Sequence, residues 1–255
     1  MPSARHAAPA LLVLSLTVSL VACGGGGGES APPRSAAPVT NPVDPATAAT
    51  VTGRVTFTGK APAPQPITMA ADPRCINPGA VTERVVTGAN GALQNVFVYV
   101  KDGLGNLTFP VPTTPVVLDQ KGCQYRPHVF GVQVGQPVEI LNSDGTLHNI
   151  HALPMTNQEF NVGQPIQGLR HTHTFSTKEV MVPFKCDVHK WMNAYVGVLD
   201  HPFHAVTQPD GSFSLKGLPP GTYTVEAWHE TLGTMTQSVT VGANETKDVA
   251  FSFAG

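Results

Sequence analysis

The sequence predicts an all-β protein built from β-sandwiches. From Val51 onward, apolar segments of about five to seven residues alternate with polar residues at a period of two, and Gly, Pro, Asn or Asp separate them. Gly and Pro, at 25 and 24 of the 255 residues, allow many tight turns but are too few for a disordered chain. We find no amphipathic helix of more than a few turns, and we expect the polar residues 157–169 to form a long loop.

The composition excludes several classes of function. Charged residues are 13% of the chain and the net charge is −2, so we expect no nucleic-acid partner. A phosphate-binding G-x-x-x-x-G-K-[ST] motif is missing, as is a G-x-G-x-x-G motif after a strand. Nucleotide chemistry therefore has no support in the sequence.

The first 48 residues are expected to contain an export signal and a flexible linker rather than part of the folded domains. Residues 11–22 are an apolar run after Arg5, too short to span a membrane but suited to an export signal at 1–22. The tetrapeptide Leu-Val-Ala-Cys at 20–23 resembles the bacterial lipobox, which implies a lipid on Cys23 and an exported protein anchored to a membrane, facing the periplasm or the cell exterior. The alternative is an ordinary signal peptide cut near Ala22. Residues 23–48, rich in Gly, Pro and Ala, are predicted to form a flexible linker.

Two segments in the middle of the chain contain candidate metal ligands. The segment EILNSDGTLHNIHAL contains His148, and VPFKCDVHKWMNAYVGVL contains Cys186, His189 and Met192. A thiolate, two imidazoles and a thioether are the ligand set of a copper electron-transfer site. Structural zinc prefers four strong ligands, for which Met is a poor choice. The alternative is that these side chains merely pack in the core.

Both segments resemble the corresponding parts of the cupredoxins, the small blue copper proteins. In that family a His, often followed by Asn, comes after a strand that ends near an Asn, and the Cys, His and Met lie on the loop before the last strand. The short Cys-x₂-His-x₂-Met spacing is that of the amicyanin type. The resemblance implies a Greek-key sandwich with one type 1 copper ion, held by His148, Cys186 and His189 with Met192 as the axial ligand. It also implies that Asn142 and Asn149 tie the two ligand loops together.

Other side chains near these motifs have less specific interpretations. His151 lies three residues after His148, which on a strand places it on the opposite face. His171 and His173 share one strand face. They either bind a second metal ion or are two solvent-exposed side chains with no such role. Trp191, with Met192 and Phe184, forms either an apolar collar around an exposed edge of His189, where a partner would dock, or ordinary core packing.

The cysteines left over from these assignments are Cys75 and Cys123. In an exported protein spare thiols tend to pair, so we expect a Cys75–Cys123 disulfide. The alternative is two separate buried thiols.

The last part of the chain resembles a different module. The run DGSFSLKGLPPGTYTVEAW resembles the carboxypeptidase regulatory-like (transthyretin-like) β-sandwich, which we assign to 205–255, with the cupredoxin-like domain at 49–204. Residues 49–110 look like the opening of the same module. They either supply the first strands of the cupredoxin-like domain or pair with the C-terminal module.

The sequence therefore indicates an electron carrier and not an enzyme. Four protein ligands leave no open position for a substrate, so we expect no small-molecule substrate. The expected partners are redox proteins, a cytochrome or a dehydrogenase, with the membrane reached through the lipid anchor. The alternatives are a protein that stores or delivers copper, and a surface adhesion module without redox activity.

Overall fold

The computed structural model describes residues 39–75 and 77–255, which belong to one compact unit. The predicted signal at 1–22, Cys23 and the linker up to residue 38 lie outside this range. Within it, sixteen strands and one 3₁₀ turn, η1 (Ala89–Gly91), make up the regular structure, in agreement with the all-β prediction. Across these residues, no helix has the length and apolar character that crossing a membrane requires.

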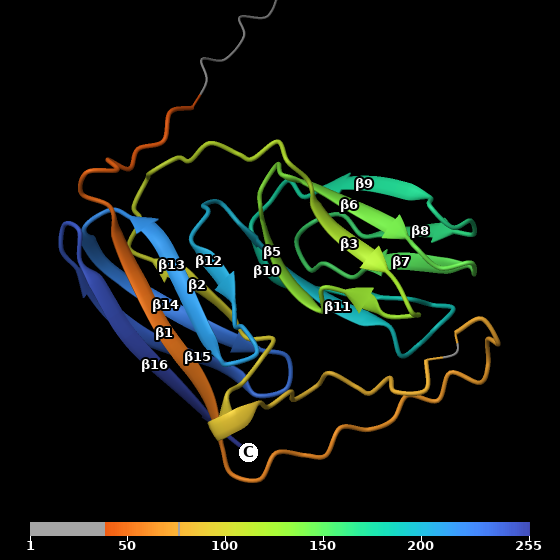
Figure 1. Ribbon diagram of the computed structural model, residues 1–255. Helices are drawn as coiled ribbons and strands as arrows, with labels where there is room; N and C mark the ends of the chain where they lie inside the picture. The colour runs from red at the N-terminus through yellow and green to blue at the C-terminus, as the bar shows by residue number, and fades with distance from the viewer. Residues whose placement is uncertain (1–38, 76) are drawn as a thin grey trace, which may run out of the picture. The chain divides into compact units, whose positions relative to one another are not determined.

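The strands between residues 116 and 199 form one sandwich of two sheets, with orders β5-β11-β10-β7-β8 and β4-β3-β6-β9 (Figure 1). Most neighbours are antiparallel, but β3 runs parallel to β6 and β11 runs parallel to β5. Alternating apolar side chains of both sheets form its core. The strands are β3 (Val116–Gln120), β4 (Tyr125–Arg126), β5 (Val129–Gln133), β6 (Pro137–Asn142), β7 (His148–Ala152), β8 (Phe160–Gln164), β9 (Arg170–Thr174), β10 (Glu179–Lys185) and β11 (Asn193–Leu199).

The first two strands pair with the last ones to form a second sandwich, with sheet orders β13-β1-β16 and β12-β2-β14-β15. β1 runs antiparallel to β13 and parallel to β16, and β2 is antiparallel to β12 and β14. This is one of the two arrangements that the sequence left open, a module split by the insertion of the other sandwich. Its strands are β1 (Ala49–Thr58), β2 (Phe97–Asp102), β12 (His204–Val206), β13 (Ser212–Leu218), β14 (Gly221–His229), β15 (Gly233–Val241) and β16 (Thr246–Ala254).

A third apolar cluster joins the two sandwiches. It contains Phe97 and Tyr99 of β2 together with Val129, Met181 and Leu199 of the other sandwich. The ring of Phe97 is fully buried over a pair of glycines that face each other on β5 and β11. A Cβ on Gly197 would lie 2.3 Å from this ring, and one on Gly131 would lie 2.7 Å from it. The two glycines therefore make the space that Phe97 occupies.

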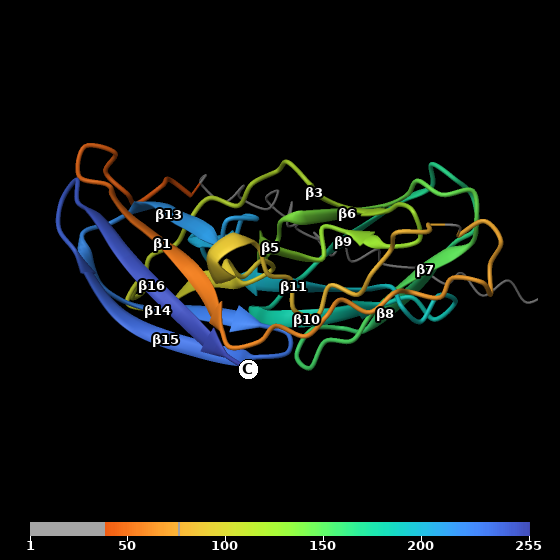
Figure 2. The ribbon, with the colours of Figure 1, turned by 60° about the horizontal axis from the view of Figure 1, so that its bottom comes forward.

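The long segment between β1 and β2 reaches away from the sandwich to which both strands belong. In Figures 1 and 2 this orange segment leaves β1, runs to the loops of the other sandwich and returns to β2. The Arg74 guanidinium donates to the carbonyl of Gly145, and the Thr146 hydroxyl donates to Asp72. Cys75 forms a disulfide with Cys123, with Cα atoms 5.5 Å apart, which confirms the predicted pair.

The expectation of a long loop at 157–169 was wrong in part. β8 occupies the middle of this segment as an edge strand paired with β7. Phe160, Val162 and Gln164 face inward at a period of two, and the last of them is fully buried. A fully buried Gln in a mostly polar run conceals the inner face of this strand in the sequence, because the pattern looks polar on both sides.

Replacing Gly197 tests the junction. We expect Gly197→Ala to lower the free energy of unfolding by about 2 kcal/mol or more, because the added methyl group overlaps the buried Phe97 ring. Gly163→Ala is the matched control, since nothing lies within 4 Å of a Cβ there. Urea unfolding of both variants measures the difference, and equal losses would contradict the role given to Phe97.

Buried histidines give a second test. Burial lowers the pKa of His204 to about 4. The unfolded chain takes up a proton near pH 6.5 and the folded chain does not, so this site loses stability as the pH falls from 6.5 toward 4. Replacing it removes that loss. We expect His204→Gln to gain about 2 kcal/mol relative to the unaltered protein between pH 7 and pH 5. Urea unfolding at both pH values measures this.

Candidate metal centre

Two strand ends bring the predicted ligands together. β6 ends at Asn142, a turn follows, and β7 begins with His148. β10 ends at Lys185, directly before Cys186, and a short loop with His189 leads into β11. His148, Cys186, His189 and Met192 are all buried, with exposed fractions of 0, 1, 2 and 1%. All four positions predicted from the sequence thus lie inside one end of the sandwich.

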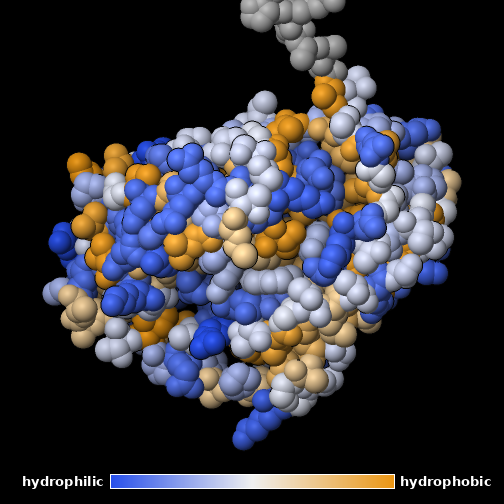
Figure 3. Space-filling model, turned by 180° about the vertical axis from the view of Figure 1, so that it is seen from behind, coloured by the Kyte–Doolittle hydropathy of each residue, from blue (hydrophilic) through white to orange (hydrophobic). Residues whose placement is uncertain are grey.

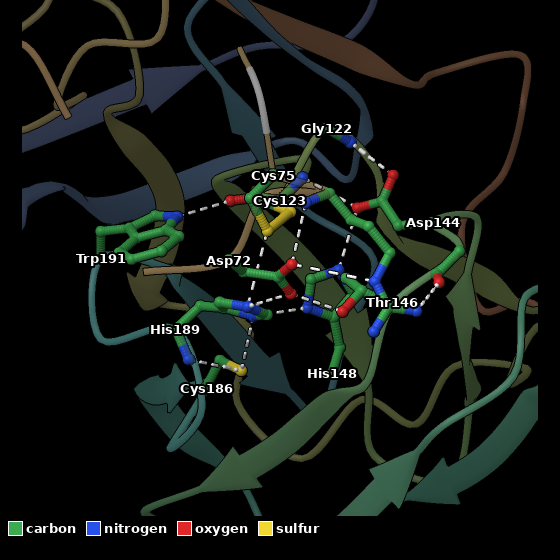
Figure 4. Close-up of a disulfide and its surroundings, with 12 residues drawn as sticks. Asp72, Cys75, Gly122, Cys123, Asp144, Thr146, His148, Cys186, His189 and Trp191 are labelled. Atoms are coloured by element: carbon green, nitrogen blue, oxygen red, sulfur yellow. Dashed lines mark hydrogen bonds and ion pairs between the residues drawn. A yellow bond between two sulfur atoms is a disulfide. The ribbon is translucent and has the colours of Figure 1, made fainter. Parts of the chain in front are cut away.

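The donor atoms of three of these residues converge (Figure 4). The Nδ1 atoms of His148 and His189 are 2.9 Å apart, and Cys186 Sγ lies 3.9 Å from His189 Nδ1. One ligand atom from each of the three lies within 4.8 Å of the others. Met192 is joined to the same loop by the hydrogen bond from its backbone N–H to the carbonyl of His189, at 2.9 Å.

The Nε2 atom of each histidine, on the side of the ring away from the other histidine, forms a hydrogen bond with a carboxylate. His148 Nε2 is 2.9 Å from Asp144, and His189 Nε2 is 3.2 Å from Asp72. A carboxylate accepts, so in neutral rings the proton is on Nε2 and both Nδ1 atoms present lone pairs. Two lone pairs that face each other next to a thiol require a cation between them, either a proton or a metal ion.

Asn149 holds the thiol and the ligand loop. Its Oδ1 accepts from the thiol of Cys186 at 3.2 Å and from the backbone N–H of Asp187 at 2.7 Å. Burial raises the pKa of Cys186, but hydrogen bonds from His148 and from backbone amides outweigh it, so the pKa lies below its ordinary value. The site therefore favours the thiolate, which is the form that binds metals.

The charges around the two rings differ. Burial opposes protonation of His148, yet the hydrogen bond that its ring donates to Asp144 and the interaction with Cys186 raise its pKa overall. Burial, followed by the charge of His148, lowers the pKa of His189. Hydrogen bonds from Thr146 and from the backbone of Arg74 lower the pKa of Asp72 to about 2, so this carboxylate is charged at neutral pH.

Part of the β1–β2 segment, with Asp72 and Cys75, lies over His189 and covers it. Cys75 Sγ, in the disulfide, is 3.5 Å from His189 Nε2, and Trp191 donates its indole N–H to the carbonyl of Cys123 at 2.9 Å. Phe184 and Met192 are each 1% exposed. The expected collar around an exposed edge of His189 is thus wrong, because Asp72 and the disulfide cover that edge; of the three proposed collar residues only Trp191 is partly exposed.

The remaining predicted residues have separate positions. Asn149 links the two ligand loops, but Asn142 does not: its amide donates to the carbonyls of Thr146 and Gln164 and so fixes the turn before His148. His151 faces away and lies between Asp187 and Glu159. His171 and His173 flank Phe160, and no metal-ligand group in the described part of the chain includes either of them.

Sequence reasoning missed both carboxylates. Asp144 lies four residues before His148, and its carboxylate also accepts the backbone N–H groups of Gly122 and Cys123. Asp72 lies three residues before Cys75. The Asn-Ser-Asp-Gly turn was a signal for Asp144, because Asp in such turns binds nearby backbone groups. Asp72 had no local signal, since its contact depends on the disulfide.

Two further groups of possible ligands each share one histidine with this centre. Asp72, Cys75 and His189 form one, and Cys123, Asp144 and His148 form the other. Cys75 and Cys123 are bonded to each other and therefore offer no thiolate. The centre thus has one free thiol, that of the buried Cys186.

Comparison with known proteins gives a module for the end of the chain. Residues 192–254 match the model of the carboxypeptidase regulatory-like domain. In the structure that module also includes β1 and β2, which complete its two sheets. The match begins in the ligand loop, so it also spans β11 of the other sandwich.

Solved structures similar to this chain include copper proteins and cupredoxins. A copper-containing nitrite reductase from Thermus scotoductus matches with 19% identity and a TM-score of 0.33 over 40% of this chain and 26% of its own length. A reduced amicyanin mutant matches with 23% identity and a TM-score of 0.30 over 34% of this chain and 85% of its own. A purple cupredoxin from Nitrosopumilus maritimus matches with 22% identity and a TM-score of 0.29 over 33% of this chain and 98% of its own. No curated protein sequence matches. With TM-scores this low, the case for the site rests on its own geometry.

Removing the Asp72 carboxylate tests its role in fixing His189. We expect Asp72→Ala to weaken copper binding about tenfold to a hundredfold, and Asp72→Asn to lose less, because an amide oxygen still accepts from Nε2. Competition with a chelator of known affinity measures this. Asp102→Asn, which removes a carboxylate that binds only its neighbouring backbone N–H, is the matched control. Equal affinity in Asp72→Ala and the control would show that the ring is held by packing alone.

Proposed function

We propose that this protein is a blue copper protein that carries single electrons, and that His148, Cys186, His189 and Met192 would hold one copper ion. One observation supports it above the others. Two imidazole Nδ1 atoms and one thiol, from loops about 40 residues apart, lie within 4.8 Å of one another in a buried place.

The chemistry of the donors fits copper. Two imidazoles and a thiolate in one plane, with a thioether at a longer distance, are the typical ligands of a copper electron-transfer site. Zinc in a structural site takes four strong ligands, and the fourth side chain here is a methionine. In the neutral rings both Nδ1 atoms offer lone pairs, and the pKa of Cys186 lies below its ordinary value, so the thiolate forms more readily.

The chain's contribution is to keep the ligands in place. Bound copper supplies a one-electron couple. Each ring is held at Nε2 by a carboxylate, and Asn149 holds the thiol together with the amide of Asp187. Ligands held from behind move little when the charge at the centre changes, which keeps the barrier to electron transfer small. Four protein ligands also leave no position for a substrate.

The cover over His189 favours electron transfer over copper storage or delivery. A protein that hands copper to a partner needs a ligand that the partner can reach. Here every proposed ligand is at most 2% exposed, and the disulfide fixes the segment that covers His189. Electrons cross such a layer and ions do not. Trp191, whose ring centroid is 5.1 Å from that of His189, is partly exposed and gives the short way to the surface.

We also propose that the protein is exported and anchored to a bacterial membrane through a lipid on Cys23, with a redox protein as its partner. The disulfide supports export, because disulfides persist in oxidising compartments. The lipobox-like sequence before Cys23 supports the anchor.

Loading with copper tests the proposal. We expect the metal-free protein to take up one equivalent of Cu(II) and to develop an intense absorption from thiolate-to-copper charge transfer. Cys186→Ser should remove this absorption, and His171→Ala, which alters a histidine outside the cluster, should retain it. Absorption and electron spin resonance spectra measure both. Copper bound one-to-one without colour would contradict the type 1 assignment.

A further inference from the structure

A cavity next to the ligand loop has features that the copper site does not explain. It has a volume of about 380 Å³ and lies among residues 81–84, residues 124–128, residues 190–195 and the turn at Glu230. This volume is within the range of small-molecule sites and suits a single-ring compound. The four segments lie far apart in the sequence, so no local sequence motif predicts the cavity.

The cavity wall contains a buried polar pair, His128 and Glu230. Their side chains are 4% and 6% exposed, and His128 Nε2 is 2.6 Å from a carboxylate oxygen of Glu230. His128 Nδ1 is 3.1 Å from the carbonyl of Asn193, which only accepts, so Nδ1 has a proton and a second proton is shared between Nε2 and Glu230. A buried pair of this kind is a poor source of stability, because desolvation offsets the attraction. In a cavity it presents a carboxylate to a hydroxyl group of a ligand.

Aromatic side chains form much of the remaining wall. Trp191, Tyr125 and Tyr195 line the cavity. The indole N–H of Trp191 donates a hydrogen bond to the carbonyl of Cys123, and the hydroxyl of Tyr125 donates one to the carbonyl of Asn149. Tyr125 is 1% exposed, so the accessible ring surface of the wall belongs to Trp191 and Tyr195, which are partly exposed. Such surface favours a planar ring as the occupant.

Positive charge dominates the mouth. Arg84 and Lys190 line the cavity and are exposed, and within the described part of the chain neither forms an ion pair. The acidic Glu83 is already bound through both oxygens by Arg126. His128 and Glu230 neutralise each other. The uncompensated charge at the cavity is therefore positive, which favours an acidic group on the occupant.

We propose that this cavity binds a small hydroxylated aromatic carboxylate. The ring lies against Trp191, the hydroxyl group donates to Glu230, and the carboxylate faces Arg84 and Lys190. Because Trp191 also lies against His189, a bound ring adjoins the ligand loop of the metal centre. Binding needs no metal ion, so this proposal stands or falls apart from the copper assignment.

Titration calorimetry on the metal-free full chain tests it, with 4-hydroxybenzoate as the probe. We expect saturable one-to-one binding, and about tenfold weaker binding of benzoate, which lacks the hydroxyl, and of phenol, which lacks the carboxylate. Quenching of tryptophan fluorescence by the probe should be smaller in Trp191→Phe. No saturable binding of 4-hydroxybenzoate would overturn the proposal.

Variants assign the two ends of the probe. Glu230→Gln should weaken 4-hydroxybenzoate about tenfold and leave benzoate unchanged, whereas Arg84→Gln with Lys190→Gln should weaken 4-hydroxybenzoate and leave phenol unchanged. Lys216→Gln, an exposed lysine on β13, is the control for a lost surface charge. Arg84 and Lys190 are exposed, so their replacement does not threaten the fold. Equal losses for all three compounds in every variant would show that the cavity does not recognise these groups.

Discussion

The centre depends on one constraint: the outer nitrogen of each histidine ring is bound to a carboxylate. Asp144 fixes His148 and Asp72 fixes His189, so both Nδ1 atoms point inward as lone pairs, 2.9 Å apart. A neutral imidazole has one donor and one acceptor nitrogen. Because the carboxylate fixes the proton on Nε2, the Nδ1 atom is left as the acceptor that faces the centre. The same carboxylates bring negative charge close to the rings. Together with a thiolate at Cys186, this makes the centre electron-rich, which would stabilise the higher oxidation state of a metal ion held there.

The split module explains how Asp72 reaches this centre. β1 and β2 both belong to the sandwich of the C-terminal strands, and the segment between them extends to the other sandwich and returns. Both ends of the segment are held by strand pairing, and the disulfide from Cys75 to Cys123 fixes its far part. In the loop-entropy model a bridge that closes a loop of this size stabilises the fold by up to about 4 kcal/mol. Apart from this segment, the two sandwiches are packed together by the Phe97 ring, which lies over Gly131 and Gly197.

The sequence predicted what local patterns encode. Period-two alternation gave the all-β class, and the residue types of two segments, together with their resemblance to the cupredoxins, gave the four proposed ligand positions. The Cys75–Cys123 pair followed from counting cysteines. Asp72 and the exposure of His189 were out of reach, because both depend on how a long segment folds over a distant loop. β8 was missed because its inner face contains a buried Gln, whose amide donates to the carbonyls of Ile140 and Leu169. The cavity at Trp191 needs four separate segments at once, which no spacing rule contains.

The closed cover changes what the surface near the metal can do. With Phe184 and Met192 buried, and with Asp72 and the disulfide over His189, a partner does not meet a ligand directly. Trp191 then becomes the shared element, since its ring contacts His189 on one side and lines the cavity on the other. Its N–H is fixed on Cys123, next to the disulfide, so its position depends on the same covalent link that holds the cover. Breaking that link therefore affects the cover, the indole and the cavity wall together, whereas the thiol held by Asn149 and the His148–Asp144 contact rely on strand pairing within the sandwich.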